Sequence, residues 1–181
     1  MFKIKNRRQN LFFNNMKILL NNINYFLKND FLYLKNVYFC KLFIPKFISI
    51  LIKNDTLIVE NLKRQKCMFN AFISNLNNLI LGIKNLWTKK LEISGIGYKI
   101  SLEKNFLILF VGYSNSIKII IPDYIKVNIN KNSIILLSVY KDKLGVFTEK
   151  LTKIKKYDPY KKKGIFLLNK SFTKKSSKKK Q

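Results

Sequence analysis

Four segments of the chain share one pattern of apolar and polar positions. Each has an alternating apolar run, a polar centre of the Lys-Asn or Asn-Asp type, and a second alternating run; the segments are Ile23–Asn36, Ile48–Asn61, Tyr98–Val111 and Tyr124–Val139. Alternation places every second side chain on one face of a strand, and asparagine tolerates the left-handed backbone of a tight turn. Each segment therefore predicts a β-hairpin, and the recurrence indicates an internal repeat.

Two further segments have the period of an amphipathic helix. One follows the second hairpin and the other follows the fourth; their apolar stripes are Phe69, Phe72, Ile73, Leu76, Ile80 and Ile83, and Leu144, Phe147, Leu151 and Ile154. We expect Asp142 to cap the second helix and Pro159 to end it. Each stripe is better explained as core than as a binding surface, because a small sheet needs a covering layer.

The order hairpin–hairpin–helix thus occurs twice. This order predicts an α+β fold, a tandem duplication of a small antiparallel sheet with one packed helix, followed by a basic C-terminal tail. We expect a basic N-terminal extension at residues 1–22, a first, divergent α+β unit at 23–87, a second α+β unit at 88–160, and a lysine-rich loop and tail at 161–181.

The charge balance extends the prediction from fold to function. The 181 residues include 36 Lys and Arg against 9 Asp and Glu, a formal net charge of +27. Self-repulsion on this scale favours a polyanionic partner, for which nucleic acid is the usual candidate and an anionic membrane surface the alternative. Nearly all the basic residues are lysines, which suit phosphates better than bidentate reading of base edges.

Several kinds of chemistry are disfavoured by what the sequence lacks. It has no histidine, the commonest general base and metal ligand. Cys40 and Cys67 are too far apart in sequence for a metal knuckle and are typical of buried thiols in a reducing compartment. The most apolar region, residues 37–52, is interrupted by two lysines and a proline, so it does not reach the length of a membrane span. We expect no enzyme active site, no cofactor, no metal site and no membrane insertion.

The compositional bias bears on origin. Lys, Asn, Ile, Phe and Tyr dominate, a bias typical of A+T-rich genomes such as those of organelles and some parasites. Residues 1–29 hold basic residues and no acid, which is typical of a transit peptide, although a basic extension retained in the mature protein explains them equally well.

Three short stretches go beyond composition. Residues 88–99 read TKKLEISGIGYK, where Gly95 and Gly97 fail as a dinucleotide fingerprint because no helix pattern follows; glycines within a strand instead mark a bulge or a close backbone approach. Residues 112–114 read GYS. Residues 158–165 read DPYKKKGI, in which a glycine frees the backbone and three lysines stand together where phosphates can approach.

In order and spacing these stretches resemble the large-subunit ribosomal protein L-six family of the bacterial or organellar type. The matching stretches are TKKLE at 88–92, GIGY at 95–98, GYS at 112–114, the DKLG helix start at 142–145 and PYKKKGI at 159–165. The resemblance is strong over about residues 64–167, weaker over 23–63, and absent from the first twenty or so. Lys162 stands where the family's loop usually has glycine, and Asn115 replaces a frequent histidine, so no contact through that imidazole carries over.

The resemblance implies a structural constituent of the large subunit of an organellar ribosome, without catalysis. Its expected partners are large-subunit rRNA, near the sarcin–ricin and factor-binding region, and neighbouring large-subunit ribosomal proteins; no small-molecule substrate and no homo-oligomer are expected. The expected location is the mitochondrial matrix, on the mitoribosome, with a plastid-type organelle as the alternative.

We expect the second unit, its loop and its tail to hold the RNA by neutralising phosphates and reading RNA shape. The candidate RNA-binding residues are Lys161, Lys162, Lys163, Gly164, Lys89, Lys90, Lys99, Tyr160, Lys174, Lys175, Lys178, Lys179 and Lys180. Tyr113 and Tyr160 are candidates for base stacking, with a turn-stabilising role as the alternative. A solvated tail that only aids solubility is the alternative for the C-terminal lysines.

Two rival functions remain at this stage. A basic protein that binds nucleic acid or an anionic membrane surface outside the ribosome shares the charge, but membrane binding requires an exposed apolar helix face, whereas both stripes are needed by the sheets. An RNA-modifying enzyme would need an acid–base or cofactor constellation that the sequence does not display.

Overall fold

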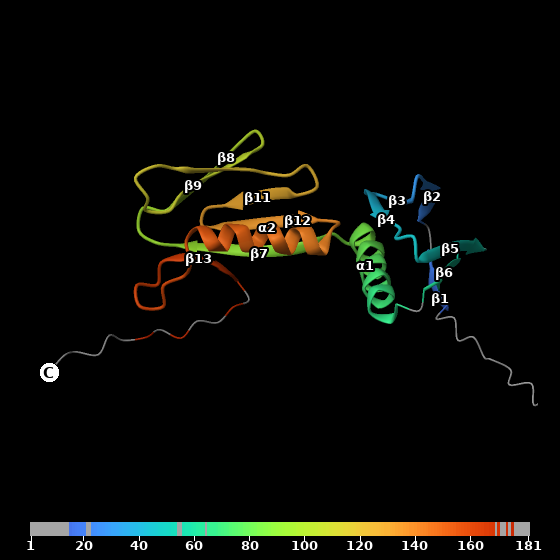
Figure 1. Cartoon of the computed structure of the whole chain (residues 1–181). Helices are drawn as coiled ribbons and strands as arrows, with labels where there is room; N and C mark the ends of the chain where they lie inside the picture. Colours follow the sequence, from blue (N-terminus) through green and yellow to red (C-terminus); the bar gives the residue numbers. More distant parts are fainter. Residues whose placement is uncertain are drawn as a thin grey trace, which may run out of the picture. The chain divides into compact units, whose positions relative to one another are not determined.

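The computed structural model describes residues 15–20, 23–53, 56–63, 65–168, 170, 173 and 175. It divides into two compact units, Met1–Ile80 and Leu81–Gln181, whose elements are labelled in Figure 1. Both units combine small antiparallel sheets with helix, so the predicted α+β class is confirmed. No helix in the described part of the chain is both long and apolar enough to cross a membrane.

The first unit holds two three-stranded antiparallel sheets, in the orders β1-β6-β5 and β2-β3-β4. The elements are β1 (Asn15–Leu19), β2 (Asn24–Lys28), β3 (Phe31–Lys35), β4 (Phe39–Phe43), β5 (Ile48–Lys53), β6 (Thr56–Asn61) and α1 (Lys66–Lys84), whose last turn passes the limit of the unit. All six apolar residues of the first predicted stripe are buried on α1, which confirms that the stripe is core.

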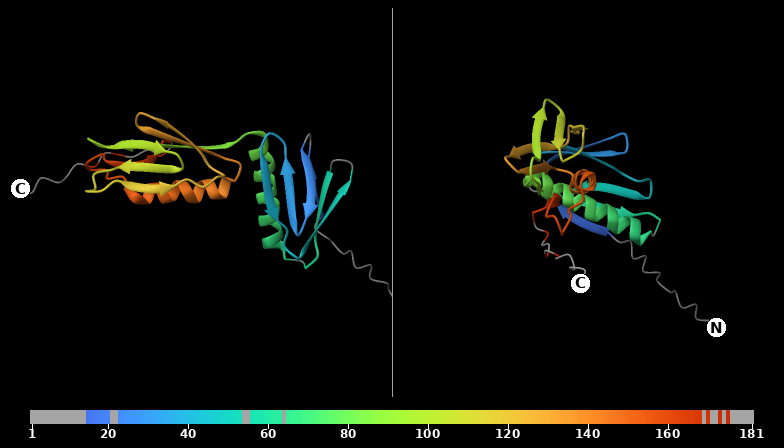
Figure 2. Two further views of the ribbon diagram at one scale, coloured as in Figure 1. Left: turned by 90° about the horizontal axis from the view of Figure 1, so that it is seen from above. Right: turned by 90° about the vertical axis from the view of Figure 1, so that its left-hand side faces the viewer.

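The second unit holds a three-stranded sheet, β10-β9-β8, and a four-stranded sheet, β11-β12-β7-β13. The elements are β7 (Trp87–Ser94), β8 (Lys99–Glu103), β9 (Phe106–Phe110), β10 (Ile117–Ile120), β11 (Lys126–Asn130), β12 (Ser133–Ser138), α2 (Lys141–Ile154) and β13 (Gly164–Leu167). Helix α2 lies along one face of the four-stranded sheet, as Figures 1 and 2 show. Leu144, Phe147 and Leu151 carry its stripe into the core beside Leu91 and Leu136.

The duplication holds strand for strand. The sheet β1-β6-β5 corresponds to β7-β12-β11, the sheet β2-β3-β4 corresponds to β8-β9-β10, and each series is followed by its helix. Only the second unit continues, with β13 added beside β7. The predicted tandem duplication is therefore confirmed, with two sheets in each unit rather than one.

All four predicted hairpins form. In the first hairpin, Asn29 (φ 47°) and Asp30 (φ 59°) supply the left-handed turn that the Asn-Asp pair predicted. In the third hairpin the left-handed residue is Lys104 (φ 49°) rather than the asparagine that follows it.

Strands also form in the terminal segments. β1 lies within residues 1–22 and pairs with β6, so that Ile18 stands opposite Leu57. β13 lies within residues 161–181 and pairs with β7, so that Ile165 stands opposite Ile93. Both strands lie at the edge of their sheet. Their apolar residues Ile18 and Ile165 are buried in the core.

Three expectations about ends and thiols need correction. Tyr140, not Asp142, is the N-cap of α2, and it makes no side-chain cap bond; Asp142 lies in the first turn, where its charge still favours the helix dipole. The helix ends at Ile154, so Pro159 does not end it. Cys40 is buried, which raises its pKa to about 11, but Cys67 is exposed.

We predict that the residues flanking the end of β1 differ sharply in their contribution to stability. Leu20 is 1% exposed and Leu19 is 64% exposed. Leu20→Ala should lower the free energy of unfolding by about 2–5 kcal/mol, because it leaves a cavity in the core. Leu19→Ala should change it by less than about 0.5 kcal/mol. Urea denaturation of the nucleic-acid-free protein, followed by far-UV circular dichroism, measures both; equal losses would mean that this segment is not part of the folded unit.

Candidate nucleic-acid interface

A loop rich in lysine joins the end of α2 to β13, and its two arms are tied together. We call residues 155–163 the lysine loop. The Ile165 amide donates to the Lys155 carbonyl at 2.9 Å, and the Asp158 amide donates to the Lys163 carbonyl at 2.8 Å. Asp158 and Lys163 form an antiparallel bridge. Because backbone bonds close the loop on itself, its tip is held in one place.

The tip of the lysine loop is a tight turn. The Tyr160 amide donates to Oδ1 of Asp158 at 2.8 Å, so the aspartate closes the turn on its own backbone. The Ser94 hydroxyl, at the end of β7, donates to the Lys162 carbonyl. Lys162 has a left-handed backbone, φ 52°. This conformation explains why the family that the loop resembles usually has glycine there; here a lysine adopts it and adds a charge.

Gly164 allows the chain to leave the lysine loop and enter β13. Its φ is +139°, and a Cβ built on it would stand 2.6 Å from Cα of Tyr157 and 2.7 Å from the carbonyl oxygen of Lys156. Both obstacles are backbone atoms that the hydrogen bonds of the loop hold in place. Glycine is therefore required by the crossing of two backbone segments, and its role is to shape the loop rather than to contact a ligand through a side chain.

The loop presents its cations and one ring to solvent. Lys161 and Lys162 are exposed, Tyr160 is 55% exposed, and Lys163 is half-buried. Three lysines on one short, fixed turn form a concentrated positive site, suited to the closely spaced phosphates of a nucleic acid. Tyr160 offers a ring beside them, and its backbone rather than its hydroxyl stabilises the turn.

A second group of lysines lies along the edge where β13 pairs with β7. The Leu168 amide donates to the Lys90 carbonyl at 3.1 Å, which brings the start of the tail against β7. A hollow of about 520 Å³ results; it is lined by Thr88, Lys89, Lys90, Leu167, Leu168 and Lys170. Lys89, Lys90 and Lys170 are exposed, so three cations and two leucines line the hollow.

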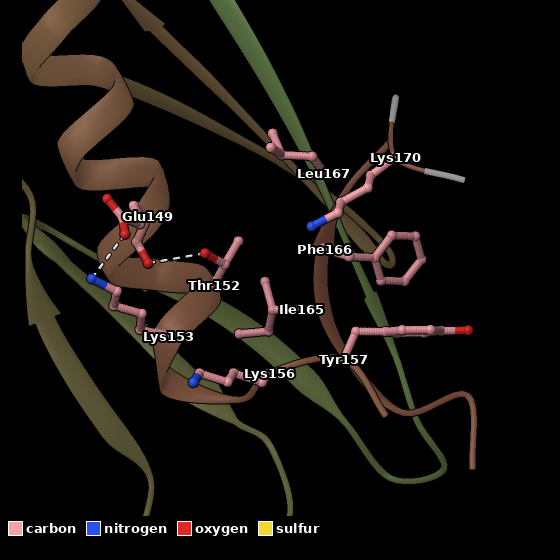
Figure 3. A pocket seen from close by; sticks show the side chains of 9 residues that line it. All are labelled: Glu149, Thr152, Lys153, Lys156, Tyr157, Ile165, Phe166, Leu167 and Lys170. Carbon is pink, nitrogen blue, oxygen red and sulfur yellow. Dashed lines mark hydrogen bonds and ion pairs between the residues drawn. The ribbon is translucent and has the colours of Figure 1, made fainter. Parts of the chain in front are cut away.

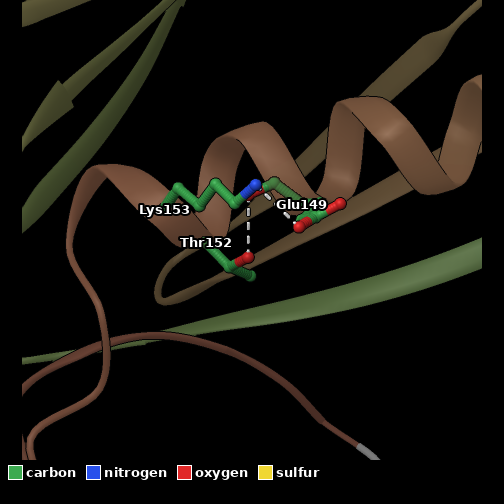
Figure 4. Close-up of polar contacts among 3 residues, drawn as sticks. All are labelled: Glu149, Thr152 and Lys153. Atoms are coloured by element: carbon green, nitrogen blue, oxygen red, sulfur yellow. Dashed lines mark hydrogen bonds and ion pairs between the residues drawn. The ribbon is translucent and has the colours of Figure 1, made fainter.

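Another hollow, of about 310 Å³, lies between the last turns of helix α2 and strand β13 (Figure 3). Its lining residues are Glu149, Thr152, Lys153, Lys156, Tyr157, Ile165, Phe166, Leu167 and Lys170. The Nζ of Lys153 lies 2.8 Å from Oε1 of Glu149, and the Thr152 hydroxyl donates to the Glu149 carbonyl at 2.9 Å (Figure 4). The hydrogen bond and the charge of Lys153 lower the pKa of Glu149, so this carboxylate stays ionised and offsets one lysine.

Three lysines that line these hollows are not among the RNA-binding residues predicted from the sequence. Lys153 lies in the last turn of α2, Lys156 lies two residues beyond the end of the helix, and Lys170 follows β13. Helical spacing could have indicated Lys153. Lys170 belongs to the lysine-rich segment 161–181, but its place in the hollow depends on the pairing of β13 with β7.

The glycine-containing stretches TKKLEISGIGYK and GYS meet around one ring. β7 ends at Ser94, so Gly95 and Gly97 lie in the following turn rather than within a strand. The Tyr98 ring approaches Gly95 so closely that a Cβ there would stand 2.7 Å from Cδ2, which confirms the expected close approach. Tyr113, in the GYS stretch, donates from its hydroxyl to the Ile154 carbonyl at 2.9 Å. It closes the C-terminal end of α2, so the turn-stabilising alternative fits Tyr113 better than base stacking.

Not all candidate residues come together. Lys99 begins β8, in the other sheet of the unit, and is exposed there. Lys175 is exposed; Lys174, Lys178, Lys179 and Lys180 lie outside the described residues. Across the described part of the chain, no group of three or more His, Cys, Asp or Glu side chains is placed to hold a metal ion.

Comparison with known proteins gives a consistent set of relatives. No family model matches the chain. It is 35% identical over 135 residues to large ribosomal subunit protein uL6 of Mycoplasma genitalium, covering 72% of this chain and 73% of that protein. It is 37% identical over 144 residues to uL6 of Amoebophilus asiaticus, covering 75% and 78%. It is 32% identical over 141 residues to uL6c of Guillardia theta, covering 76% and 79%.

We predict opposite effects of alanine at two glycines of the second unit. Gly164→Ala should lower the free energy of unfolding by about 1–3 kcal/mol or more, because the new Cβ meets backbone and φ is unfavourable. Gly145→Ala, in α2 with nothing within 4 Å of the new Cβ, should raise it by about 0.5–1 kcal/mol. Urea denaturation followed by the fluorescence of Trp87, the single tryptophan, reports on this unit. A neutral Gly164→Ala would mean that the backbone crossing is not formed in solution.

Proposed function

Because the chain belongs to the uL6 family of large ribosomal subunit proteins, we propose that its second unit binds large-subunit rRNA through the lysine loop and the edge formed by β7 and β13. As a member of this family, the chain is a structural constituent of the large ribosomal subunit and not an enzyme. Its partners are rRNA and other ribosomal proteins.

The observation that carries the proposed site is the fixed presentation of lysines on the lysine loop. Backbone bonds close the loop, Ser94 anchors Lys162, and Gly164 provides the only residue type that fits the crossing. Because the backbone that carries these lysines is already held, binding does not have to order the loop, and the three cations are presented together to the phosphates of folded RNA. The neighbouring hollow adds Lys89, Lys90 and Lys170, and we extend the site to Lys99 and to the tail lysines as secondary contacts.

The finer placement is also part of the proposal. We place the binding site on rRNA near the sarcin–ricin and factor-binding region, which follows from the family resemblance, so that the protein supports translational GTPases without contributing chemistry. We propose that the ribosome is that of an organelle, the mitochondrion, with a plastid-type organelle as the alternative. The amino-acid composition, which is typical of A+T-rich genomes, supports this proposal. The divergent first unit then contacts neighbouring proteins or RNA of its own.

A basic protein acting outside the ribosome is a weaker explanation of the same charge. Membrane binding by helices would need an apolar face in contact with lipid, whereas the stripes of both α1 and α2 are buried in the core. The identity to uL6 proteins extends over some three quarters of the chain, which favours the ribosome.

We predict that the tagged protein sediments with the large ribosomal subunit in a sucrose gradient at moderate salt. High salt should release part of it, because phosphate contacts weaken as counterions compete. A matched control is the tag alone, expressed from the same promoter. Recovery of the protein only at the top of the gradient, away from large subunits, would refute membership of the ribosome.

We predict that replacing Lys161, Lys162 and Lys163 by alanine weakens binding to large-subunit rRNA and flattens its salt dependence. Each lost phosphate contact removes roughly 0.7–0.9 from the slope of log affinity against log salt, so the triple variant loses up to about 2–3. A matched triple variant changes Lys104, Lys118 and Lys131, which are exposed in the same unit; Lys104, like Lys162, has a left-handed backbone. If both triples reduce the slope equally, net charge rather than the lysine loop governs binding.

A further inference from the structure

The outer face of the β2-β3-β4 sheet, in the first unit, carries an unusual set of side chains. Its strands pair antiparallel, so that Phe26 stands opposite Tyr33, and Phe31 opposite Phe43. Alternation assigns nine positions of the three strands to this side. We call them the aromatic face; they are Asn24, Phe26, Lys28, Phe31, Tyr33, Lys35, Phe39, Lys41 and Phe43.

The rings of the aromatic face line up across all three strands. Phe26 and Tyr33 stack with centroids 4.6 Å apart and planes 5° apart, and Tyr33 and Phe39 are 5.8 Å apart with planes at 28°. Phe31 and Phe43 meet edge to face at 5.4 Å. A run of nearly parallel rings thus extends from β2 through β3 to β4, and Phe26 and Phe39 stand at its two ends.

These rings are not needed to fill the core. The opposite face of the sheet already supplies the buried residues, with Leu32, Leu34 and Cys40 no more than 1% exposed. By contrast Phe26 is 47% exposed, while Phe39 and Phe43 are each 54% exposed. Rings this exposed offer apolar surface to a ligand, although the faces that Phe26, Tyr33 and Phe39 turn toward one another are already covered.

The charges on the aromatic face are all positive. Lys28, Lys35 and Lys41 contribute one cation from each strand, and Lys41 lies 5.8 Å from the centroid of the Phe31 ring. No acidic residue occurs in these three strands, all of which are described; the nearest in sequence is Asp30, in the turn between β2 and β3. A ligand for this face is therefore flat, apolar and anionic at once.

Neither the fold nor the composition explains the aromatic face. The duplicate sheet β8-β9-β10 presents only Phe106 and Phe110 as rings at its outer positions, together with an acid, Glu103. Aromatic residues make up 14% of the sequence but five of the nine positions of the aromatic face. The same architecture thus folds without these rings, so their concentration in one place points to binding.

We propose that the aromatic face binds a single-stranded segment of RNA, whose unpaired bases stack on the rings while its phosphates lie against the lysines. Base–aromatic stacking tolerates any sequence and requires bases that are free of a duplex, which matches rings in a row with no polar groups arranged to read base edges. The inference rests on the proposed function in one respect, since rRNA supplies the strand. The aromatic face consists of residues of the first unit, whereas the lysine loop belongs to the second.

The test uses the full chain and two RNA probes: a fluorescent oligouridylate of about ten nucleotides, within the range of a stacking platform, and an RNA duplex of similar length. Phe39→Leu/Phe43→Leu keeps apolar side chains at these positions and removes the rings. It should raise the Kd for the single strand about fivefold or more and leave the Kd for the duplex unchanged. Phe106→Leu/Phe110→Leu, the matched change on the duplicate sheet, should alter neither value.

A second measurement locates the contact directly. Oligouridylate containing 4-thiouridine, irradiated with the wild-type protein, should crosslink within residues 24–43. Unchanged single-strand affinity of Phe39→Leu/Phe43→Leu, or crosslinks confined to other parts of the chain, overturns the proposal and leaves the aromatic face to a protein partner. Failure of the ribosomal assignment would instead appear in sedimentation and in the lysine-loop triple variant, which leave the aromatic face intact.

Discussion

A formal net charge of +27 on 181 residues is the constraint on which the rest of the structure depends. Apolar burial has to hold each unit against this repulsion, and no described lysine is buried. Surface pairs such as Lys153–Glu149 offset little, because both side chains are largely exposed. The cores are accordingly built from fully buried leucines, Leu32 and Leu57 in the first unit and Leu91 and Leu136 in the second. Salt screens part of the remaining repulsion and a bound polyanion relieves more of it, so RNA binding and folding stability are linked.

The second unit meets this constraint by holding in place the backbone that carries some of its lysines. The pairing of β13 with β7 returns the chain to the sheet, and the return holds the lysine loop at one end and Lys170 at the other. The requirement for Gly164 follows, because the loop can close only where two backbone segments pass within reach of a Cβ. The string of lysines before Gly164 therefore depends on the backbone structure: the glycine permits the crossing, and the crossing positions the lysines.

The sequence allowed the hairpins and helices to be predicted because their signals are local. Alternation and helical period are set within some fifteen residues, and the buried stripe of Leu144, Phe147 and Leu151 lies where its period placed it. These local signals did not predict the position of residues that depend on pairing with a strand distant in the sequence. β13 is four residues long, amid lysines, and forms because β7 is there to pair with it; Lys170 is brought to the edge by the same pairing. Likewise the pattern did not distinguish the sides of the first hairpin, because Phe26 and Tyr33 on one face and Leu32 and Leu34 on the other are all apolar. In this hairpin, only the exposure of the side chains in the folded structure shows which face is core and which is surface.

The two units differ in the features that the duplicated framework does not require. Strands β1 to β6 and β7 to β12 repeat the same order, so common architecture accounts for the sheets and the helices. The features that the units do not share are β13 with its lysine loop, in the second unit, and the aromatic face, in the first unit. Binding through the first feature would rest on charge and weaken steeply with salt, whereas the stacking part of binding to the second would depend less on salt. A chain with both features would hold folded RNA through one unit and an unpaired strand through the other. As the salt concentration rises, the contribution of the first contact to the affinity would fall faster than that of the second. In the first unit the buried face of the β2-β3-β4 sheet, with Leu32, Leu34 and Cys40, contributes to the core, which leaves the exposed face available for a contact of its own.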